Sequence, residues 1–291
     1  MKQGILITAY KNFDHLIDII RFFDDHFEIY IHIDKKCTPP AETLQRIRTL
    51  KNVKFVSSAY KVNWGGLNHL KSILLLAEEA LKNPELSYIH LISGQDFPSK
   101  DVSYFKDFMH KSRRNDFLEY ATMPAPFWSR GGMDRLEQYN FYDVFDARKY
   151  GKWIVKLITL QRMLKIKRPI SSKVPQLYGG STWWSLTRQT LQYVLTYTNQ
   201  NKYLLRRLKH TFCAEEIYFQ TVIMNSPHAG NVINDNLRYI DWNLRNGSIP
   251  AILDSTDFDR IRSSNKLFAR KLEGPISNTL KTTLLQKNIL N

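Results

Sequence analysis

The sequence predicts an α/β protein whose sheet is mostly parallel and is flanked by helices. In the first third of the chain, short apolar runs alternate with amphipathic segments in which apolar residues recur at helical spacing. Strands separated by helices need crossover connections, and these place successive strands parallel in one sheet. The chain has 291 residues, 43% of them hydrophobic, so it can bury the core of one large domain.

The predicted elements follow one another closely up to residue 93. The strands are the apolar runs GILITAY, EIYIHID, VKFVSS and SYIHLIS, at 4–10, 28–34, 53–58 and 87–93. The helices between them cover 15–27, 41–50 and 68–82. After residue 110 the pattern loosens, and the clearest later elements are helices at 186–197 and 214–225.

Polar residues follow each predicted strand, in the segments AYKN, HIDKK, SSAYKVNWGG and SGQDFPSK. In a parallel sheet, ligands bind beyond the carboxyl ends of the strands, so we expect a binding site at this edge. The first strand is followed by neither G-x-G-x-x-G nor G-x-x-x-x-G-K-[ST]. Because those glycines let backbone N–H groups approach phosphate, dinucleotide oxidoreductases and P-loop enzymes are disfavoured.

The cysteine content and the lengths of the apolar runs narrow the class of protein further. The two cysteines, Cys37 and Cys213, are too few for a disulfide framework or a zinc site. The first apolar run becomes polar too soon for a signal peptide, and no run approaches the roughly 20 apolar residues of a membrane span. We therefore expect a soluble, cytoplasmic protein.

The formal net charge of +15 predicts an anionic partner. Basic residues are enriched at 147–168 and 202–209, where they alternate with apolar residues at roughly helical spacing. This pattern is typical of amphipathic helices that contact an anionic membrane, but solvated helix faces would show it as well. A nucleic-acid-binding protein is the rival class. No known module signature is present, so we expect no nucleic-acid partner.

The segment CAEEIYFQ (213–220) places two carboxylates, Glu215 and Glu216, directly before an apolar run. Acidic residues stabilise the first turn of a helix by offsetting the positive end of its dipole. This explains one of the two glutamates simply. The second needs a stronger reason.

Six segments together resemble the core 2/I-branching enzyme family of glycosyltransferases, which also contains the peptide O-xylosyltransferases. They occur in this order: IYIHIDKK, VNWGGLNHLKSILLLAEEAL, YIHLISGQDFPSK, YGGSTWWSLTRQTLQYVL, CAEEIYFQTVI and KLFARKLE. The resemblance covers roughly residues 4 to 273. It implies a GT-A-like fold, an inverting mechanism, a UDP-sugar donor such as UDP-GlcNAc or UDP-xylose, and neither a cofactor nor a required metal ion.

The resemblance also assigns the reacting group. The family's general base is the glutamate of an S-P-D-E-Y-like segment, which corresponds to Glu216 in this chain. Such a base removes the proton of the acceptor hydroxyl as that oxygen attacks the sugar. Glu215 falls on the acidic neighbour, which we assign to the helix start on the acceptor side.

The cations for the departing diphosphate follow from a second motif. The family's L-F-A-x-K segment corresponds to 267–271, which assigns Lys271 to the diphosphate, although without the motif it would be an ordinary surface lysine. The arginine of the branching enzymes has no counterpart in NGSIP (246–250). Three residues are left as its substitute: Arg245, Arg262 or Arg270.

A metal site is not expected. The only D-x-D is Asp257-Phe258-Asp259, whose setting is typical of a capped helix start. Near the fourth strand, the segment 93–98 contains a single carboxylate, Asp96. Hard divalent cations prefer several carboxylate oxygens, so we predict that protein cations replace the metal.

The remaining candidates line the two substrates. On the donor side we place Tyr10, Asp34, Trp64, Gly65 and Asp96, with Asp34 alternatively a turn-capping residue. On the acceptor side, besides Glu215, we place Ser181, Trp184, Trp242, Arg130 and Arg135. Aromatic faces pack on sugar rings, but Trp183 and Trp184 are equally compatible with a core position.

These assignments give a single glycosyltransferase domain at 1–273, with a nucleotide-sugar-binding half (1–110) and an acceptor and catalytic half (111–273), followed by a polar helical tail (274–291). We predict a metal-independent transferase that acts on a glycan or lipid-linked oligosaccharide in surface polysaccharide synthesis, with peripheral contact to the inner membrane face. The alternatives are a basic nucleic-acid-binding protein and a sugar-binding relative without catalytic activity.

Overall fold

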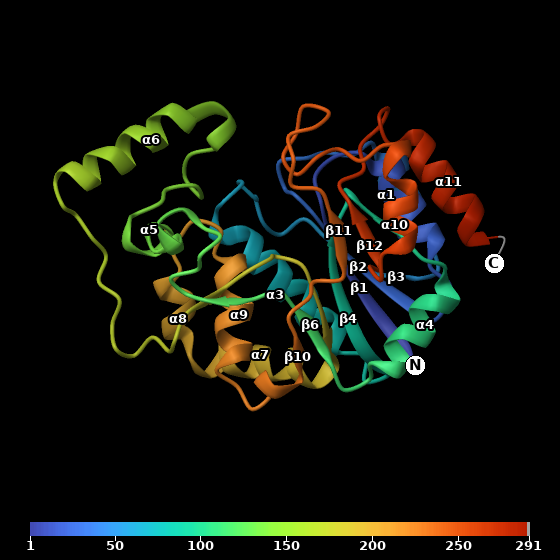
Figure 1. Ribbon diagram of the computed structural model, residues 1–291, viewed down its shortest axis with the longest axis horizontal. Helices are drawn as coiled ribbons and strands as arrows, with labels where there is room; N and C mark the ends of the chain where they lie inside the picture. Colours follow the sequence, from blue (N-terminus) through green and yellow to red (C-terminus); the bar gives the residue numbers. More distant parts are fainter. Residues whose placement is uncertain (290–291) are drawn as a thin grey trace.

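The protein is organised around a seven-stranded sheet with the order β10-β6-β9-β4-β1-β2-β3. A computed structural model describes residues 1–289 (Figure 1). Neighbouring strands run parallel except at β9, which is antiparallel to both β4 and β6. The predicted α/β class, with a mostly parallel sheet flanked by helices, is confirmed.

The strands of this sheet are β1 (Lys2–Ala9), β2 (Phe27–Ile33), β3 (Val53–Ser57), β4 (Leu86–Ser93), β6 (Asp116–Leu118), β9 (Trp184–Thr187) and β10 (Val232–Ile233). The other strands are β5 (Asp96–Pro98), β7 (Ala121–Thr122), β8 (Tyr178–Gly179), β11 (Arg238–Ile240) and β12 (Phe268–Arg270). The four strands predicted in the first third are confirmed as β1 to β4. The later strands are only two to four residues long, too short to show a period.

The α-helices are α1 (Phe13–Phe22), α2 (Ala41–Arg48), α3 (Leu67–Leu81), α4 (Val102–Lys111), α5 (Asp134–Glu137), α6 (Ala147–Met163), α7 (Arg188–Gln200), α8 (Lys202–Arg207), α9 (Glu215–Met224), α10 (Phe258–Ser263) and α11 (Asn278–Ile289). Three short 3₁₀ segments lie at η1 (Ser129–Gly132), η2 (Ala229–Asn231) and η3 (Ser255–Asp257). All five predicted helices are present, as α1, α2, α3, α7 and α9.

Two hydrophobic clusters cover the two faces of the sheet. Side chains alternate along a strand, so in β1 Leu6 contributes to one cluster while Ile5 and Ile7 contribute to the other. The Leu6 cluster contains the buried sides of α3, α7 and α9. The opposite cluster contains those of α1, α4, α10 and α11. Figure 1 shows these two groups of helices on opposite sides of the strands.

A smaller sheet with the order β11-β12-β5 lies beside the carboxyl end of β4. β12 pairs antiparallel with β5, and this register places Arg270 opposite Asp96. The pairing brings a segment from the end of the chain to the edge where the nucleotide-sugar half was predicted to bind.

The predicted halves and tail are parts of one body. β6, β9 and β10 come from the 111–273 half but extend the sheet of the 1–110 half. The expected tail is helical, as α11, yet Leu280 and Leu284 are fully buried in the core. Lys281 also contacts Asp18 of α1 at 2.6 Å. α11 is therefore a structural helix of the domain.

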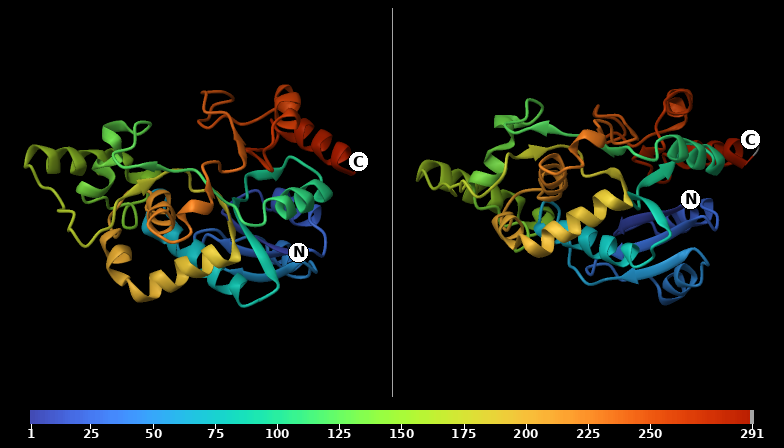
Figure 2. Two further views of the ribbon diagram at one scale, coloured as in Figure 1. Left: turned by 60° about the horizontal axis from the view of Figure 1, so that its bottom comes forward. Right: turned by 90° about the horizontal axis from the view of Figure 1, so that it is seen from below.

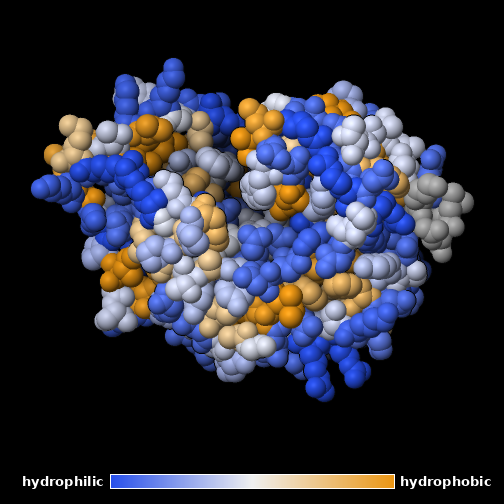
Figure 3. Space-filling model, in the orientation of Figure 1, coloured by the Kyte–Doolittle hydropathy of each residue, from blue (hydrophilic) through white to orange (hydrophobic). Residues whose placement is uncertain are grey.

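One helix stands apart from the rest. α6 projects from the end of the molecule farthest from α11 (Figures 1 and 2). Hydrophilic and hydrophobic side chains lie next to each other over its surface (Figure 3). Within residues 1–289, no helix combines the length and the apolar character that crossing a membrane requires.

Candidate active site

The direction of strand addition reverses between β1 and β4. From β1 the sheet grows through β2 and β3 on one side, and through β4, β9 and β6 on the other. Ligands of open α/β sheets bind at such a switch point, where the connections leave in opposite directions and open a crevice. The backbone is closely packed here, since Gly94 N donates to Thr8 O at 2.9 Å.

Glu215 and Glu216 are the first two residues of α9, and their side chains have different partners. An oxygen of Glu215 lies 3.0 Å from Nδ1 of His69, on α3. An oxygen of Glu216 accepts a hydrogen bond from Arg135 Nη1 at 2.5 Å. Because adjacent like charges repel, this separation allows both carboxylates to occupy one helix start.

Glu215 is the more buried of the pair, with 5% of the residue exposed. Nε2 of His69 lies 3.3 Å from the Thr8 hydroxyl at the end of β1. A chain of polar contacts therefore runs from the switch point to the start of α9. The second oxygen, Oε2, is buried and has no hydrogen-bond partner among the described residues. Glu215 is at the predicted helix start, but it also anchors α9 to α3.

Glu216 is reachable from solvent, because 26% of its side chain is exposed. Burial of the carboxyl and the neighbouring charge of Glu215 raise the pKa of Glu216 to about 7, against the opposing effects of Arg135 and His69. A carboxyl with this pKa is divided between its acid and base forms near neutral pH, as general acid–base catalysis requires.

Arg135 was predicted on the acceptor side, and the structure places it against Glu216. Its guanidinium lies 3.8 Å from the ring centroid of Trp128 and 5.2 Å from that of Phe212. Stacking on aromatic rings fixes the orientation of the planar group. Arg135 can thus hold the Glu216 carboxylate in one position.

A second charged centre surrounds Asp96. Its Oδ2 accepts from Ser93 N at 2.7 Å and from the Ser93 hydroxyl at 2.5 Å, and it lies 3.4 Å from Arg270 Nη1. Asp96 is fully buried, and its Oδ1 has no partner within residues 1–289. The Arg270 guanidinium lies 4.3 Å from the Trp183 ring centroid. Trp183 is therefore the tryptophan of its pair that faces the site.

The two centres are joined by the segment 180–184. Gly180 N donates to the Glu216 carbonyl oxygen at 2.9 Å, and Trp183 contacts Arg270 at the other end. The carbonyl of Ser181 accepts from Gln220 of α9 at 2.6 Å. Trp184, predicted to line the acceptor, is instead fully buried against Phe219 and belongs to the core.

Lys271 follows Arg270 and is half-buried. Its side chain makes no hydrogen bond or ion pair with any described residue. Burial and the Arg270 charge lower the pKa of Lys271, while Glu273 opposes the shift. A desolvated ammonium that has no hydrogen-bond or ion-pair partner is costly, and a bound anion would stabilise it.

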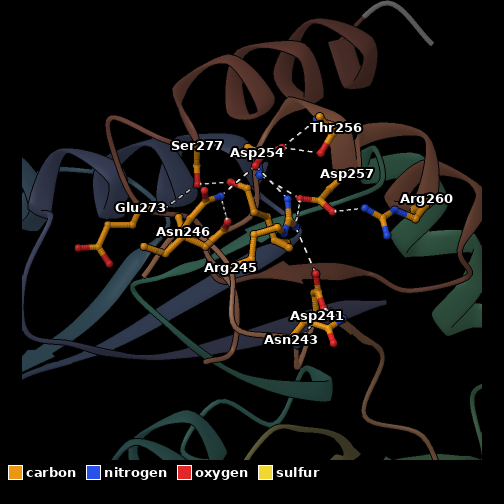
Figure 4. Close-up of polar contacts among 12 residues, drawn as sticks. Asp241, Asn243, Arg245, Asn246, Asp254, Thr256, Asp257, Arg260, Glu273 and Ser277 are labelled. Atoms are coloured by element: carbon orange, nitrogen blue, oxygen red, sulfur yellow. Dashed lines mark hydrogen bonds and ion pairs between the residues drawn. The ribbon is translucent and has the colours of Figure 1, made fainter. Parts of the chain in front are cut away.

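The three candidate arginines lie in different surroundings. Arg270 is adjacent to Lys271 and Asp96. Arg245 is held by three carboxylates, those of Asp241, Asp254 and Asp257 (Figure 4). Arg262 lies on α10, where its carbonyl oxygen accepts from Lys100 Nζ at 2.5 Å. Arg270 is thus the arginine placed to act together with Lys271.

The D-x-D segment is a helix start, as predicted. Asp254 and Asp257 form a capping box around η3, and α10 follows directly. Asp257 is fully buried between Arg245 and Arg260, at 2.5 and 2.9 Å (Figure 4). In the part of the chain that the structure describes, no group of three or more His, Cys, Asp or Glu side chains is arranged to hold a metal ion.

The rim of the switch point is built by polar contacts across the strand ends. The Tyr10 hydroxyl donates to Gln95 at 3.1 Å, and Gln95 in turn donates to Glu273 at 2.9 Å. Lys11 contacts the other oxygen of Glu273 at 2.6 Å. Asp34 accepts the backbone N–H groups of residues 36 and 62, both at 3.0 Å, which is the turn-capping role left open by the sequence.

The Trp64-Gly65 turn lies against the segment that enters α9. Gly65 has φ +80°, and its carbonyl oxygen accepts from Cys213 N at 3.0 Å. A Cβ at this position would lie 2.5 Å from the Phe212 ring. Trp64 is exposed, with its ring 5.0 Å from that of Phe212. The donor-side turn and the glutamate pair therefore form one structure.

The remaining acceptor candidates lie on the surface. Trp242 is 68% exposed, and Arg130 is exposed on η1. Beside Trp242 lies a hollow of about 210 Å³, lined by Glu119, Asn234, Asp235, Asn236, Arg238, Ile240, Trp242 and Lys266. Glu119 connects this hollow to the segment 180–184, because Gly180 packs directly on its carbonyl.

Sequence reasoning missed several residues of the site. His69, Gln95, Glu273 and Lys11 were not identified, although three of them lie within the family-like segments. His69 had a signal: it is a polar residue in the first turn of a helix that starts at the carboxyl edge of the sheet. Its partner is 146 residues away, and no local pattern shows that.

The sequence of this chain is similar to one protein family and to known enzymes. The model of the family described as Core-2/I-Branching enzyme matches residues 5–262. Mouse xylosyltransferase 1 is 26% identical over 94% of this chain and 28% of its own length. Dog xylosyltransferase 2 is 26% identical over 88% of this chain and 30% of its own length. The chain thus spans less than a third of these relatives.

Among solved structures, a glycosyltransferase involved in glycosylation of the major capsid of PBCV-1 aligns with a TM-score of 0.35 and 11% identity, over 98% of this chain and 99% of its own. S. aureus TarS 1–349 in complex with UDP-GlcNAc aligns with a TM-score of 0.32 and 19% identity, over 42% of this chain and 34% of its own.

The packing of Gly65 on Phe212 generates a prediction. Gly65→Ala and the control Gly247→Ala both place a side chain at positive φ, which costs about 1–2 kcal/mol of unfolding free energy. Only Gly65→Ala also overlaps a ring, since nothing lies within 4 Å of a Cβ at Gly247. We expect urea unfolding to show an additional loss of roughly 1–3 kcal/mol for Gly65→Ala. Equal losses in the two variants would contradict the contact.

Proposed function

Because the chain belongs to the Core-2/I-Branching enzyme family, we propose that it is a glycosyltransferase that moves a sugar from a UDP-sugar to a hydroxyl group of a glycan. One observation carries the proposal. Glu216, a partly exposed carboxyl with a pKa of about 7, is linked through the segment 180–184 to the cation pair Arg270 and Lys271. A base and a cationic site for a leaving diphosphate are the two groups that inverting sugar transfer needs.

Glu216 acts as the general base in this proposal. Its ionised form accepts the proton of the acceptor hydroxyl, whose oxygen bonds to the anomeric carbon while the bond from that carbon to the diphosphate breaks. Attack from the face opposite the leaving group inverts the anomeric centre. Arg135 holds the carboxylate in place through the 2.5 Å contact.

Lys271 and Arg270 stabilise the departing UDP. Negative charge develops on the diphosphate as the bond to the sugar breaks, and pre-positioned cations stabilise that charge. Lys271 is the stronger candidate, because its side chain forms no hydrogen bond or ion pair with a described residue, whereas Arg270 contacts Asp96. In this proposal the two cations take the role of a divalent metal, and transfer needs no metal ion.

The donor is a UDP-sugar of the UDP-xylose or UDP-GlcNAc class. The similarity to the xylosyltransferases supports the first of these. The unpartnered Oδ1 of Asp96 and Oε2 of Glu215 support a hydroxyl-rich ligand, because a buried carboxylate oxygen without a donor is costly and a sugar hydroxyl can satisfy it.

The acceptor in this proposal is a glycan or lipid-linked oligosaccharide used in polysaccharide synthesis. The hollow beside Trp242 supports a sugar ligand there. Its lining combines amide, carboxylate and cationic side chains with one exposed aromatic ring. Such a mixture suits a pyranose, which presents hydroxyl groups at its edge and C–H groups on its face.

The role of Glu216 can be tested by removing its charge. Glu216→Gln keeps the shape of the side chain but cannot take a proton, so we expect turnover of UDP-sugar to fall by about 10²–10⁴-fold. UDP affinity, measured by calorimetry, should change little. Loss of affinity with full turnover would contradict the assignment.

Glu215→Gln is the matched variant of Glu216→Gln. It weakens the buried contact to His69, so we expect a loss of about 1–3 kcal/mol in unfolding free energy, with a smaller loss of turnover. Thermal unfolding and turnover measured on both variants separate the two roles. If the profiles are reversed, Glu215 is the base. If neither variant loses activity, the two carboxylates form only a helix start.

Binding of UDP tests the cation site and the metal requirement together. We expect the same UDP affinity in EDTA as in Mn²⁺, and a loss of roughly 1.5–3 kcal/mol in Lys271→Ala, the range for a charge-assisted hydrogen bond. Lys111→Ala, an exposed lysine on α4, is the control and should bind as the unmodified protein does. A strict need for Mn²⁺, or unchanged affinity in Lys271→Ala, would refute this part of the proposal.

A further inference from the structure

The positive charge of the chain is concentrated in one region. Between Asp146 and Glu215 there is no Asp or Glu, whereas 14 Lys and Arg residues lie there. The remaining 28 basic and 27 acidic residues nearly cancel. The formal charge of +15 is therefore almost wholly a property of residues 147–214, which include α6 and α8.

α6 carries part of this charge on an unusually exposed surface. Of its 17 residues, only Ile154 and Gln161 are buried. Several of its large apolar side chains are exposed, including Trp153 at 62% and Met163 at 75%. The helix projects from the body of the molecule, where a flat partner can reach it (Figures 1 and 2).

The exposed Trp153, Leu160 and Leu164, together with the half-buried Leu157, form an ordered pattern along α6 and its C-cap. Residues 153, 157, 160 and 164 are spaced by four, three and four positions, so Trp153, Leu157, Leu160 and Leu164 lie along one face. We call these four residues the α6 stripe. Lys152 and Lys156 border it, and the Lys156 ammonium lies 4.9 Å from the Trp153 ring centroid. Lys149 lies at the start of α6, just before the break in helical geometry at Tyr150. These lysines form no ion pair with any described residue.

We propose that the α6 stripe and its bordering lysines are a docking surface for an anionic lipid bilayer. The aliphatic and tryptophan side chains enter the boundary between headgroups and acyl chains, and the lysines extend along the helix to reach the headgroups. This inference stands on the helix alone and does not depend on the proposed sugar transfer. If both hold, the surface brings the enzyme to a lipid-linked acceptor.

Two other occupants fit the surface less well. A nucleic acid would neutralise the lysines but would leave the exposed Leu160 and Leu164 without apolar partners. A second copy of the chain would cover the apolar residues but would bring together two surfaces of the same positive charge. Only a bilayer with anionic headgroups satisfies both the charge and the apolar side chains.

The test is co-sedimentation of the full chain with vesicles of phosphatidylcholine, with and without phosphatidylglycerol. We expect binding to the anionic vesicles only. The triple variant Lys149→Glu, Lys152→Glu, Lys156→Glu should weaken it by roughly a hundredfold, since each lysine contributes near an anionic surface. The matched control changes three exposed cations at the end of α4, as Lys111→Glu, Arg113→Glu, Arg114→Glu, and should weaken binding less than about threefold.

A second variant separates the contribution of the apolar side chains to vesicle binding from that of the charges. Trp153→Ser with Leu160→Ser should reduce vesicle binding while leaving its salt dependence unchanged, because the charges remain. UDP affinity should be unchanged in every variant, so loss of vesicle binding is distinct from failure of the nucleotide site. Equal losses in the two triple variants would overturn the proposal, as would salt-resistant RNA binding or dimer formation that disappears in the α6 variants.

Discussion

Two carboxylates at the start of α9 must be kept apart, and much of the site follows from how this is done. His69 of α3 contacts Glu215, and Arg135 donates a hydrogen bond to Glu216. Each partner is positioned by other parts of the fold: His69 by Thr8 at the end of β1, and Arg135 by Trp128 and Phe212. Without these partners, adjacent buried charges would protonate or move toward water. The pair therefore ties the helix to the sheet and leaves one carboxyl accessible.

The topology of the sheet determines where this glutamate pair and the nearby cations lie. The strand order reverses at β1 and β4, and ligands of open α/β sheets bind beyond the carboxyl ends of the strands at such a point. β12 pairs with β5, which brings Arg270 and Lys271 to the strand ends. α6 begins beside this edge of the sheet, where the Arg148 guanidinium lies 5.4 Å from the Tyr10 ring centroid, and the rest of the helix adds a second surface to the fold.

The sequence predicted the parts of the structure that depend on local pattern. Strands β1 to β4 and the helices between them have clear periods, and Glu216 and Lys271 lie in recognisable segments. Pairings across the chain were not predictable, because Arg135 lies 81 residues from Glu216. Trp183 and Trp184 show that a local pattern cannot decide which of two neighbouring side chains is buried. Neighbours at a strand start face opposite sides, so only the register decides which one is buried.

The protonation state of the Glu216 carboxyl is the property on which the proposed chemistry depends most directly. It can be measured without knowing either substrate, by NMR titration of the protein with ¹³C-labelled glutamate carboxyls. We predict one resonance with a midpoint near pH 7 that is missing in Glu216→Gln and moves to higher pH in Arg135→Gln, since the opposing cation is lost. If the resonance that disappears in Glu216→Gln titrates near the ordinary glutamate pKa of about 4.3, Glu216 is not poised as a base at neutral pH.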